Sequence, residues 1–353
     1  MSTRTRKLAS VQTILDISSI ENADRLEVAT VLGWKAVVQK GLYKVNDKII
    51  FIEIDSFLPI RQEFEFLRKQ YYRKFENGTV GFRVRTTRLR GQLSQGLVMP
   101  MSLLPEGDYE IGQDVTDPLR IFKYEPPVPK CIQGLAKGNF PAFIVKTDET
   151  RAQLLQEVLN RNKGLDCYTS EKIDGSSATY YIKDEVYGVC SRNLDLKVDE
   201  NPTNAFIIFG KENNIEQKLK ALNKNIAIQG ELYGVGINDN PLQLNYCSVA
   251  FFNVFDIDKC RYYDFEEFKT LIESLGLKTV PILDTNFKLI NSIDELVKLS
   301  IAKSVINPKV WREGIVIRPL KEIMDLGMSV SGYGNSGRLS FKVVNPEFLI
   351  VNE

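Results

Sequence analysis

The chain has 353 residues, 43% of them hydrophobic, and a formal net charge of +1, so it can form two globular domains but lacks the positive charge that would by itself attract nucleic acid. It contains no histidine, which excludes histidine general bases, Ser-His-Asp triads and imidazole metal ligands. The five cysteines are scattered without a CxxC pair, and no apolar run suits a membrane span or a signal peptide, so we expect reduced thiols and a cytoplasmic or nuclear location.

Residues 8–118 are predicted to form a β-rich module. Runs rich in β-branched residues lie at residues 26–39, 48–55, 81–85 and 93–99. Several short strands with one wide connection are typical of an OB-like β-barrel, a fold often used on nucleic acid. We therefore expect residues 1–120 to be an OB-like domain that orients nucleic acid.

The wide connection, residues 61–74, mixes basic and aromatic residues, and further arginines follow on the next run. Basic groups neutralise phosphates and aromatic rings stack on bases, so this surface is a candidate nucleic-acid site. Alternatively, the connection is an amphipathic helix whose aromatic side chains pack on the barrel and whose charges are solvated. The residues concerned are Arg61, Phe64, Phe66, Arg68, Lys69, Tyr71, Tyr72, Arg73 and Lys74, followed by Arg83, Arg85, Arg88 and Arg90.

Prolines at 126, 127 and 129 predict an extended linker over residues 121–140, which leaves residues 141–353 for a second domain. A helix is predicted for residues 148–163, from an acidic start to Gly164. A hairpin turning at Asp184 and Glu185 follows. Further predicted elements are helices at 204–222 and 265–274, a helix opened by Ser292 and Glu295, and strands at 226–232, 247–257, 314–318 and 339–344.

The sequence KIDG places a lysine, a carboxylate and a glycine close together. Lys172 is a candidate nucleophile, because a lysine amine attacks an electrophile once its pKa is depressed. Asp174 would point to the same side of a strand, and Gly175 would permit a turn or a close approach to a ligand. Taken alone, the tetrapeptide is equally compatible with an exposed lysine before an ordinary Asp-Gly turn.

Five charged residues follow Lys172 within apolar, strand-like contexts. Each by itself could be a member of a buried ion pair, but five in this order are hard to assign to chance. They are Arg192 in SRN, Glu231 in GELYG, Asp256 in FFNVFD, Glu313 in EGIVIR and Lys342 in SFKVV.

In their order these segments resemble the six motifs of the covalent lysyl nucleotidyltransferases, which include ATP-dependent ligases and mRNA capping enzymes. The strand-rich N-terminal module, the KTDETR segment at 146–151 and the short stretch after Val344 make the whole chain similar to RNA ligases of the Deinococcus and Naegleria type. The resemblance implies an α+β fold, with an N-terminal OB-like β-barrel followed by an ATP-grasp-like adenylyltransferase domain of antiparallel sheets and flanking helices.

The resemblance also implies a three-step mechanism. Lys172 would attack ATP to form lysyl-AMP, AMP would pass to a 5′-phosphate RNA end, and a 3′-hydroxyl would displace it to seal the strand. Such phosphoryl transfers rely on charge neutralisation, so ATP and Mg²⁺ or Mn²⁺ are the expected cofactors. The expected substrate is RNA or a nicked RNA-containing duplex, with RNA on the 3′-OH side of the nick, and the expected enzyme is a monomer.

The resemblance assigns roles to individual residues. The catalytic residues would be Lys172, Asp174, Arg192, Glu231, Glu313 and Lys342; the nucleotide would contact Glu171, Lys172, Ile173, Gly175, Arg192, Glu231, Phe255, Val316 and Lys342; and the metal would be held by Asp174, Glu231 and Glu313. Phe255 and Val316 would cover the two faces of adenine, although both could equally be core residues.

One motif departs from the family pattern. Many relatives have two lysines in the last motif, whereas Ser340 occupies the first position here, and Arg318 or Arg338 would have to supply the missing charge. Two alternatives therefore remain open. The chain could be a GTP-using capping-type guanylyltransferase, which the lack of room for an OB domain after Val344 disfavours, or an inactive nucleic-acid-binding relative.

Overall fold

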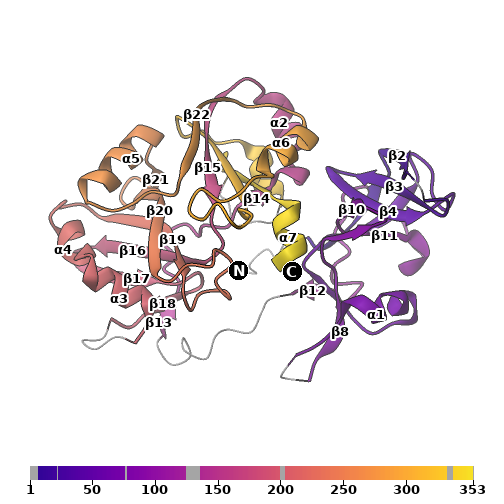
Figure 1. Cartoon of the computed structure of the whole chain (residues 1–353), viewed down its shortest axis with the longest axis horizontal. Coiled ribbons are helices and arrows are strands. Elements are labelled where there is room, and N and C mark those ends of the chain that lie inside the picture. The colour runs from indigo at the N-terminus through magenta and orange to yellow at the C-terminus, as the bar shows by residue number, and fades with distance from the viewer. Residues whose placement is uncertain are drawn as a thin grey trace. The chain divides into compact units, whose positions relative to one another are not determined.

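The computed structural model describes residues 7–21, 23–75, 78–124, 136–198, 203–331 and 337–352. The chain divides into two compact units (Figure 1). One comprises Met1–Pro126, Gln153–Gln156 and Leu349–Glu353, and the other Pro127–Ala152 and Glu157–Phe348. The predicted linker, residues 121–140, includes residues 125–135, which lie outside the described ranges.

The first unit consists of short antiparallel strands. Two sheets have three strands each, in the spatial orders β1 (Ala9–Thr13), β5 (Lys48–Ile52), β11 (Leu97–Pro100) and β2 (Asp16–Ser19), β3 (Leu26–Val31), β4 (Trp34–Gln39). A third has four strands, in the order β12 (Phe122–Lys123), β6 (Ser56–Leu58), β8 (Val80–Arg83), β7 (Tyr72–Lys74). The fourth is the pair β10 (Gln92–Ser94) and β9 (Thr87–Leu89). The run predicted at 26–39 is two strands, because the chain reverses at Leu32 in a left-handed conformation (φ 53°).

The predicted barrel is not seen as a closed ladder among the described residues of the first unit, whose strands form four separate sheets. Isolated hydrogen bonds take the place of a continuous ladder between β10 and β4. The Val37 N–H donates to Ser94 Oγ at 2.9 Å, and the Gln95 N–H donates to the Lys35 carbonyl at 2.8 Å. Side-chain and single backbone bonds can therefore join neighbouring sheets where a regular register is interrupted.

The connection at residues 61–74 combines a 3₁₀ helix η1 (Gln62–Leu67), a short helix α1 (Arg68–Tyr71) and strand β7. Phe64 is fully buried, as the packing alternative requires, whereas Phe66 is 65% exposed. The connection is therefore only partly an amphipathic helix packed on the strands.

The second unit contains two sheets. The larger, entirely antiparallel, has the order β13 (Ala136–Asn139), β18 (Leu194–Leu196), β17 (Val186–Cys190), β16 (Ser176–Lys183), β19 (Ile226–Gly234), β20 (Cys247–Asp256) and β21 (Arg261–Tyr262). The smaller has the order β14 (Thr150–Arg151), β24 (Phe341–Val344), β23 (Gly314–Pro319), β15 (Asp166–Lys172) and β22 (Ile282–Lys288), and only β14 and β24 run parallel.

Helices cover the larger sheet on one face (Figure 1). Helix α3 (Ala205–Glu212) contacts β17 and β20, α4 (Ile215–Lys220) contacts β16, and α5 (Phe265–Ser274) contacts β20. Their apolar side chains, with those of the sheet, form the main core, which includes Tyr180, Ile228 and Phe251. The remaining helical elements are α2 (Gln156–Arg161), α6 (Ile293–Ser300), α7 (Pro346–Asn352) and the 3₁₀ turns η2 (Met101–Leu103), η4 (Ala152–Leu154) and η5 (Leu326–Ser331).

Most elements predicted for this unit are confirmed. The hairpin turns at Asp184 and Glu185, both with positive φ, and α5 spans residues 265–274 as expected. The segment 204–222 is two helices, because Asn214 adopts a left-handed conformation between them. No helix in the described part of the chain has the length and apolar character needed to cross a membrane.

The helix predicted for residues 148–163 is wrong over its first half. Thr150 and Arg151 instead form β14, a 3₁₀ turn follows, and only Gln156–Arg161 is α-helical. Pairing of Thr150 and Arg151 with Phe341 and Lys342 gives these residues a sheet ladder, and tertiary pairing of this kind overrides a weak helical preference.

Candidate active site

Lys172 lies at the end of β15 and forms an ion pair with Glu313. The antiparallel register of β15 with β23 places Lys172 opposite Gly314, which brings the preceding residue, Glu313, beside the amine. Lys172 Nζ donates to Glu313 Oε2 at 2.7 Å, and the two side chains are only 21% and 16% exposed.

Asp174 and Glu231 complete a cluster of partly buried carboxyl groups around the lysine. Burial and the charge of Glu313 raise the pKa of Asp174 to about 7. Burial, together with the charges of Glu313 and Asp174, raises the pKa of Glu231 to about 8. Three carboxyl groups in one partly buried site repel one another when they ionise, so they take up protons more readily than free carboxyls, and a cation would favour their charged forms.

The two lysines of the site have opposite pKa shifts. Burial lowers the pKa of Lys172, but Glu313, Glu231 and Asp174 outweigh burial and hold it above its ordinary value. Burial, followed by the positive charges of Arg151 and Lys172, lowers the pKa of Lys342 to about 7. Lys172 is therefore held protonated by its carboxylate partners, and it becomes a nucleophile only when their charge is neutralised.

Gly175 is required by the close approach of β19. A Cβ atom at this position would lie 2.2 Å from the Leu232 carbonyl oxygen and 3.0 Å from Cγ of Glu231. The glycine of KIDG thus serves to bring β19, with Glu231, against the lysine segment. Asn238 tethers the same segment, because its Nδ2 donates to Asp174 Oδ1 at 3.1 Å.

The segment 146–151 contributes to the site, which the predicted helix did not suggest. Arg192 pairs with Asp148 at 2.7 Å and remains about half exposed. Thr147 Oγ1 lies 2.7 Å from Ser177 Oγ, next to the KIDG segment. Arg151 pairs with Lys342 in the sheet and is buried. No local pattern in the sequence marks residues 146–151 as part of a site, and only the resemblance to relatives indicates them.

Lys342 and Val316 share a face of the smaller sheet with Lys172. Val316 is paired with both Ser170 and Lys342 across the sheet, and Ser170 lies two residues before Lys172, which puts all of them on one face. Val316 is 8% exposed. A ligand held between Lys172 and Lys342 would therefore contact Val316.

Ser340 belongs to a buried polar network with Arg318. Arg318 Nε donates to Ser340 Oγ at 2.8 Å, and Arg318 Nη2 and the Ser340 hydroxyl both reach Glu149 Oε1, at 2.8 and 2.7 Å. Arg338 instead pairs with Glu322 and donates to Asn253. Of the two arginines considered from the sequence, Arg318 is therefore the one bonded to Ser340.

Phe255 and Phe252 occupy different environments. Phe255 is 2% exposed and packs in a core cluster with Ile144 and with Tyr262, whose ring lies 5.0 Å away. Phe252 is half-buried, its carbonyl accepts from Arg318 Nη1 at 2.8 Å, and the Arg318 guanidinium lies 5.4 Å from its ring centroid. Phe252 is therefore the more exposed of the two rings and lies beside Arg318 of the Ser340 network.

Glu171 and Ile173 alternate with Lys172, so their side chains point away from it. Ile173 is buried in a cluster with Tyr233 and Val280. Glu171 Oε2 accepts from the Val305 N–H at 2.8 Å, while Oε1 is buried without a hydrogen-bond partner among the described residues. Burial raises the pKa of this carboxyl. Asp256 lies outside the site, where it accepts from the Lys259 N–H at 3.0 Å beyond the end of β20.

The expected metal ligands fit a hydrated cation better than a closed protein cage. Across the described ranges, no group of three or more Asp, Glu, Cys or His side chains is placed to hold a metal ion directly. Asp174, Glu231 and Glu313 nevertheless concentrate negative charge around Lys172. Mg²⁺ usually keeps several waters and binds through one or two carboxylates plus substrate phosphates, which suits this arrangement.

We predict that Glu231→Gln stabilises the metal-free protein at alkaline pH. The pKa of about 8 in the folded state exceeds the ordinary glutamate value of 4.5, so the stability that Glu231 contributes is lost as pH rises from about 4.5 through 8. In EDTA, the unfolding free energy of the variant should match the wild type near pH 4 and exceed it by on the order of 2 kcal/mol at pH 9. Exposed Glu266→Gln is the control, and parallel pH profiles for wild type and Glu231→Gln would contradict the prediction.

Comparison with solved structures gives matches over nearly the whole chain. The Naegleria gruberi RNA ligase with pyrophosphate is 37% identical, with 98% of each chain covered and a TM-score of 0.86. A glutamate-to-alanine variant of that enzyme with ATP and Mn has a TM-score of 0.85, and a lysine-to-methionine variant with AMP and Mn has 0.87, both at 37% identity with 98% of each chain covered. No curated protein matched the sequence.

Family models match both parts of the chain. A model described as an OB-fold domain matches residues 8–101, and a model described as RNA ligase matches residues 166–344. The second match contains Lys172, Glu231, Glu313 and Lys342. The resemblance expected from the sequence is thereby confirmed, and the chain belongs to the RNA ligase family, whose members are ATP-dependent nucleotidyltransferases, and carries an N-terminal OB-fold domain.

Proposed function

We propose that this enzyme joins 3′-OH and 5′-phosphate RNA ends through a lysyl-AMP intermediate on Lys172. The observation that carries the proposal is the partly buried Lys172–Glu313 pair, in electrostatic contact with Asp174 and Glu231 and on the same sheet face as Lys342. All of these residues come from one chain, so a monomer would suffice.

In the first step the Lys172 amine attacks the α-phosphorus of ATP. A nitrogen–phosphorus bond forms, the bond to pyrophosphate breaks, and the protonated amine gives up two of its three protons, one to Glu313 and one to solvent. Glu313, 2.7 Å from the amine, is placed to orient it and accept a proton. A divalent cation would neutralise phosphate charge and the carboxylates that otherwise hold Lys172 protonated. Lys342, whose pKa is about 7, can gain a proton as the phosphate charge arrives.

In the second step AMP is transferred to the 5′-phosphate end, and in the third step AMP leaves from it. A 5′-phosphate oxygen attacks the lysyl-AMP phosphorus and releases Lys172, and a 3′-hydroxyl then attacks the 5′-phosphorus and releases AMP. Each step transfers a phosphoryl or nucleotidyl group, so positive side chains that neutralise phosphate charge contribute much of the catalysis. Arg192, about half exposed while paired with Asp148, is accessible for a ribose or phosphate group.

We further propose that adenine packs between Phe252 and Val316, with Phe255 in a structural role. Phe252 is half-buried beside Arg318, while Val316 lies on the same sheet face as Lys172. Glu171, with one oxygen left unpaired among described residues, remains a candidate for the adenine edge, as the resemblance implies.

The substrate proposed is a nicked duplex with RNA on the 3′-OH side. The support is the combination of an OB-fold domain with the ligase domain, because OB folds bind nucleic-acid strands through basic and aromatic surfaces. The competing capping-type function would use GTP, and an inactive relative would form no covalent adduct.

Labelling with α-³²P nucleotides tests the nucleophile. Wild type with ATP and Mg²⁺ or Mn²⁺ should become covalently labelled, Lys172→Met should lose the label completely, and Lys298→Met, at an exposed helix position, should retain it. Labelling by GTP in place of ATP would support the capping function. Retention of label by Lys172→Met would remove Lys172 from its assigned role.

Alanine substitutions separate the two phenylalanines. Phe252→Ala should raise KM for ATP in adduct formation roughly tenfold, since a stacked base is worth about 1–3 kcal/mol. Phe255→Ala should instead lower the unfolding free energy by about 3–5 kcal/mol, as expected for a truncated core aromatic side chain, with the smaller effect on KM. The reverse pattern, measured by adduct kinetics and thermal unfolding, would assign the stacking role to Phe255.

Matched nicked duplexes test the sugar preference. Two substrates that differ only in the sugar of the terminal 3′-OH nucleotides should be sealed at rates that differ at least tenfold, with the RNA strand preferred, because a 2′-hydroxyl can be hydrogen-bonded only on RNA. If the DNA 3′-OH strand were sealed as fast as the RNA strand, the proposed RNA specificity would be wrong, whereas the role proposed for Lys172 would be unaffected.

A further inference from the structure

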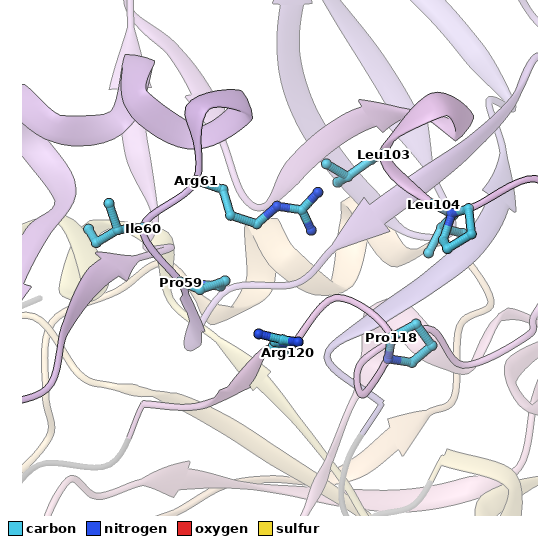
Figure 2. Close-up of a pocket in the computed structure, with 8 residues that line it drawn as sticks. Pro59, Ile60, Arg61, Leu103, Leu104, Pro118 and Arg120 are labelled. Carbon is cyan, nitrogen blue, oxygen red and sulfur yellow. The ribbon is translucent and has the colours of Figure 1, made fainter.

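A pocket of about 570 Å³ lies within the first unit (Figure 2). Its walls are apolar, formed by Ile60, Leu103, Leu104 and three prolines, and its charged lining residues are Arg61 and Arg120. Among the described residues of this unit, no acidic side chain lines it. The pocket therefore combines apolar walls with positive charge at a place separate from the Lys172 site, which lies in the other unit.

The backbone presents Arg120 in an unusual way. Arg120 has a φ of 55°, in the left-handed region that favours glycine and asparagine. Its turn is closed by the Arg120 N–H bonded to the Asp117 carbonyl at 2.9 Å, and the neighbours Leu119 and Ile121 are buried. The turn holds the exposed Arg120 side chain at the pocket, between two buried neighbours.

The Arg120 guanidinium makes no hydrogen bond or ion pair with any described residue. Arg90, in the basic surface predicted from the sequence, shares the positive φ and the exposure of Arg120 but does not line the pocket, and two other arginines of that surface are engaged. Arg68 is bonded to Glu65 at 2.6 Å, and Arg83 lies over the Tyr124 ring at 4.3 Å. Arg61, on the other side of the pocket, pairs with exposed Glu63, so Arg120 is the more available of the two pocket charges.

We propose that this pocket binds a phosphate of the RNA strand, with the apolar walls contacting the attached sugar or base. Guanidinium groups match phosphate geometry with paired donors, and two of them lining one pocket suit a single anionic group. The inference rests on the proposed function, because it takes the polynucleotide to be the substrate. It places a phosphate contact of this domain at the pocket, where Arg120 joins Arg61 of the surface predicted from the sequence.

Binding of fluorescent nicked RNA duplex to the full chain tests the pocket. Arg120→Gln should weaken binding about three- to tenfold at 100 mM salt, and Arg61→Gln with Arg120→Gln should weaken it further. The slope of log K against log salt should fall by about 0.7–0.9 for each phosphate that the variant no longer neutralises. Arg120→Lys should restore part of the affinity, and Arg120→Gly, which suits the backbone, should lose binding without loss of stability.

Arg25→Gln, an exposed charge in the same unit, is the matched control and should bind RNA like the wild type. Lysyl-AMP formation, measured without RNA, should be unchanged in every pocket variant. If the wild type is labelled by ATP and Arg120→Gln binds RNA with unchanged affinity, the pocket proposal alone is overturned. If the wild type is not labelled, the proposed function is overturned. If Arg120→Gln weakened binding to poly-glutamate as much as binding to RNA, the pocket would be assigned to an acidic protein, and the proposal would be overturned.

Discussion

The ion pair between Lys172 and Glu313 is the interaction on which the second unit depends. The two residues are 141 positions apart, and only the antiparallel ladder of β15 and β23 brings the amine within 2.7 Å of the carboxylate. Burial makes each charge costly alone, so the pair requires both partners in register. Asp174 and Glu231 add negative charge beyond what the lysine balances, as the raised pKa values of both carboxyls show.

That imbalance explains why the site suits phosphoryl transfer. A lysine held protonated is not nucleophilic, and the carboxylates that hold it protonated are groups whose charge an incoming cation neutralises. Gly175 makes the cluster possible, since any side chain there would collide with the backbone of β19. The candidate nucleophile and the groups that control its protonation are therefore built from the same close strand packing.

A second buried network of hydrogen bonds, centred on Arg318, holds together the strands beside the Lys172 site. Arg318 is 2% exposed and bonds Ser340, Glu149 and the Phe252 carbonyl, which joins residues of β20, β23 and the segment before β14. A buried arginine is tolerated when its donors are satisfied, and a satisfied network specifies one arrangement of its partners. The serine in the last motif is thus accommodated by an arginine from the neighbouring strand, although Glu149 balances that charge.

The sequence by itself determined the enzyme family, the order of the two domains, most strands of the second unit and the candidate residues Lys172, Asp174, Glu231, Glu313 and Lys342, because these depend on local spacing and residue chemistry. Only the tertiary structure decided that residues 150–151 form a strand, that Phe252 is half-buried beside Arg318 while Phe255 is buried, and that Arg318 bonds Ser340. It also showed that Arg68 and Arg83 of the predicted basic surface are engaged with neighbouring rings and carboxylates. Pairing between distant strands, burial and side-chain partners are long-range properties, and no local pattern in a single sequence contains them.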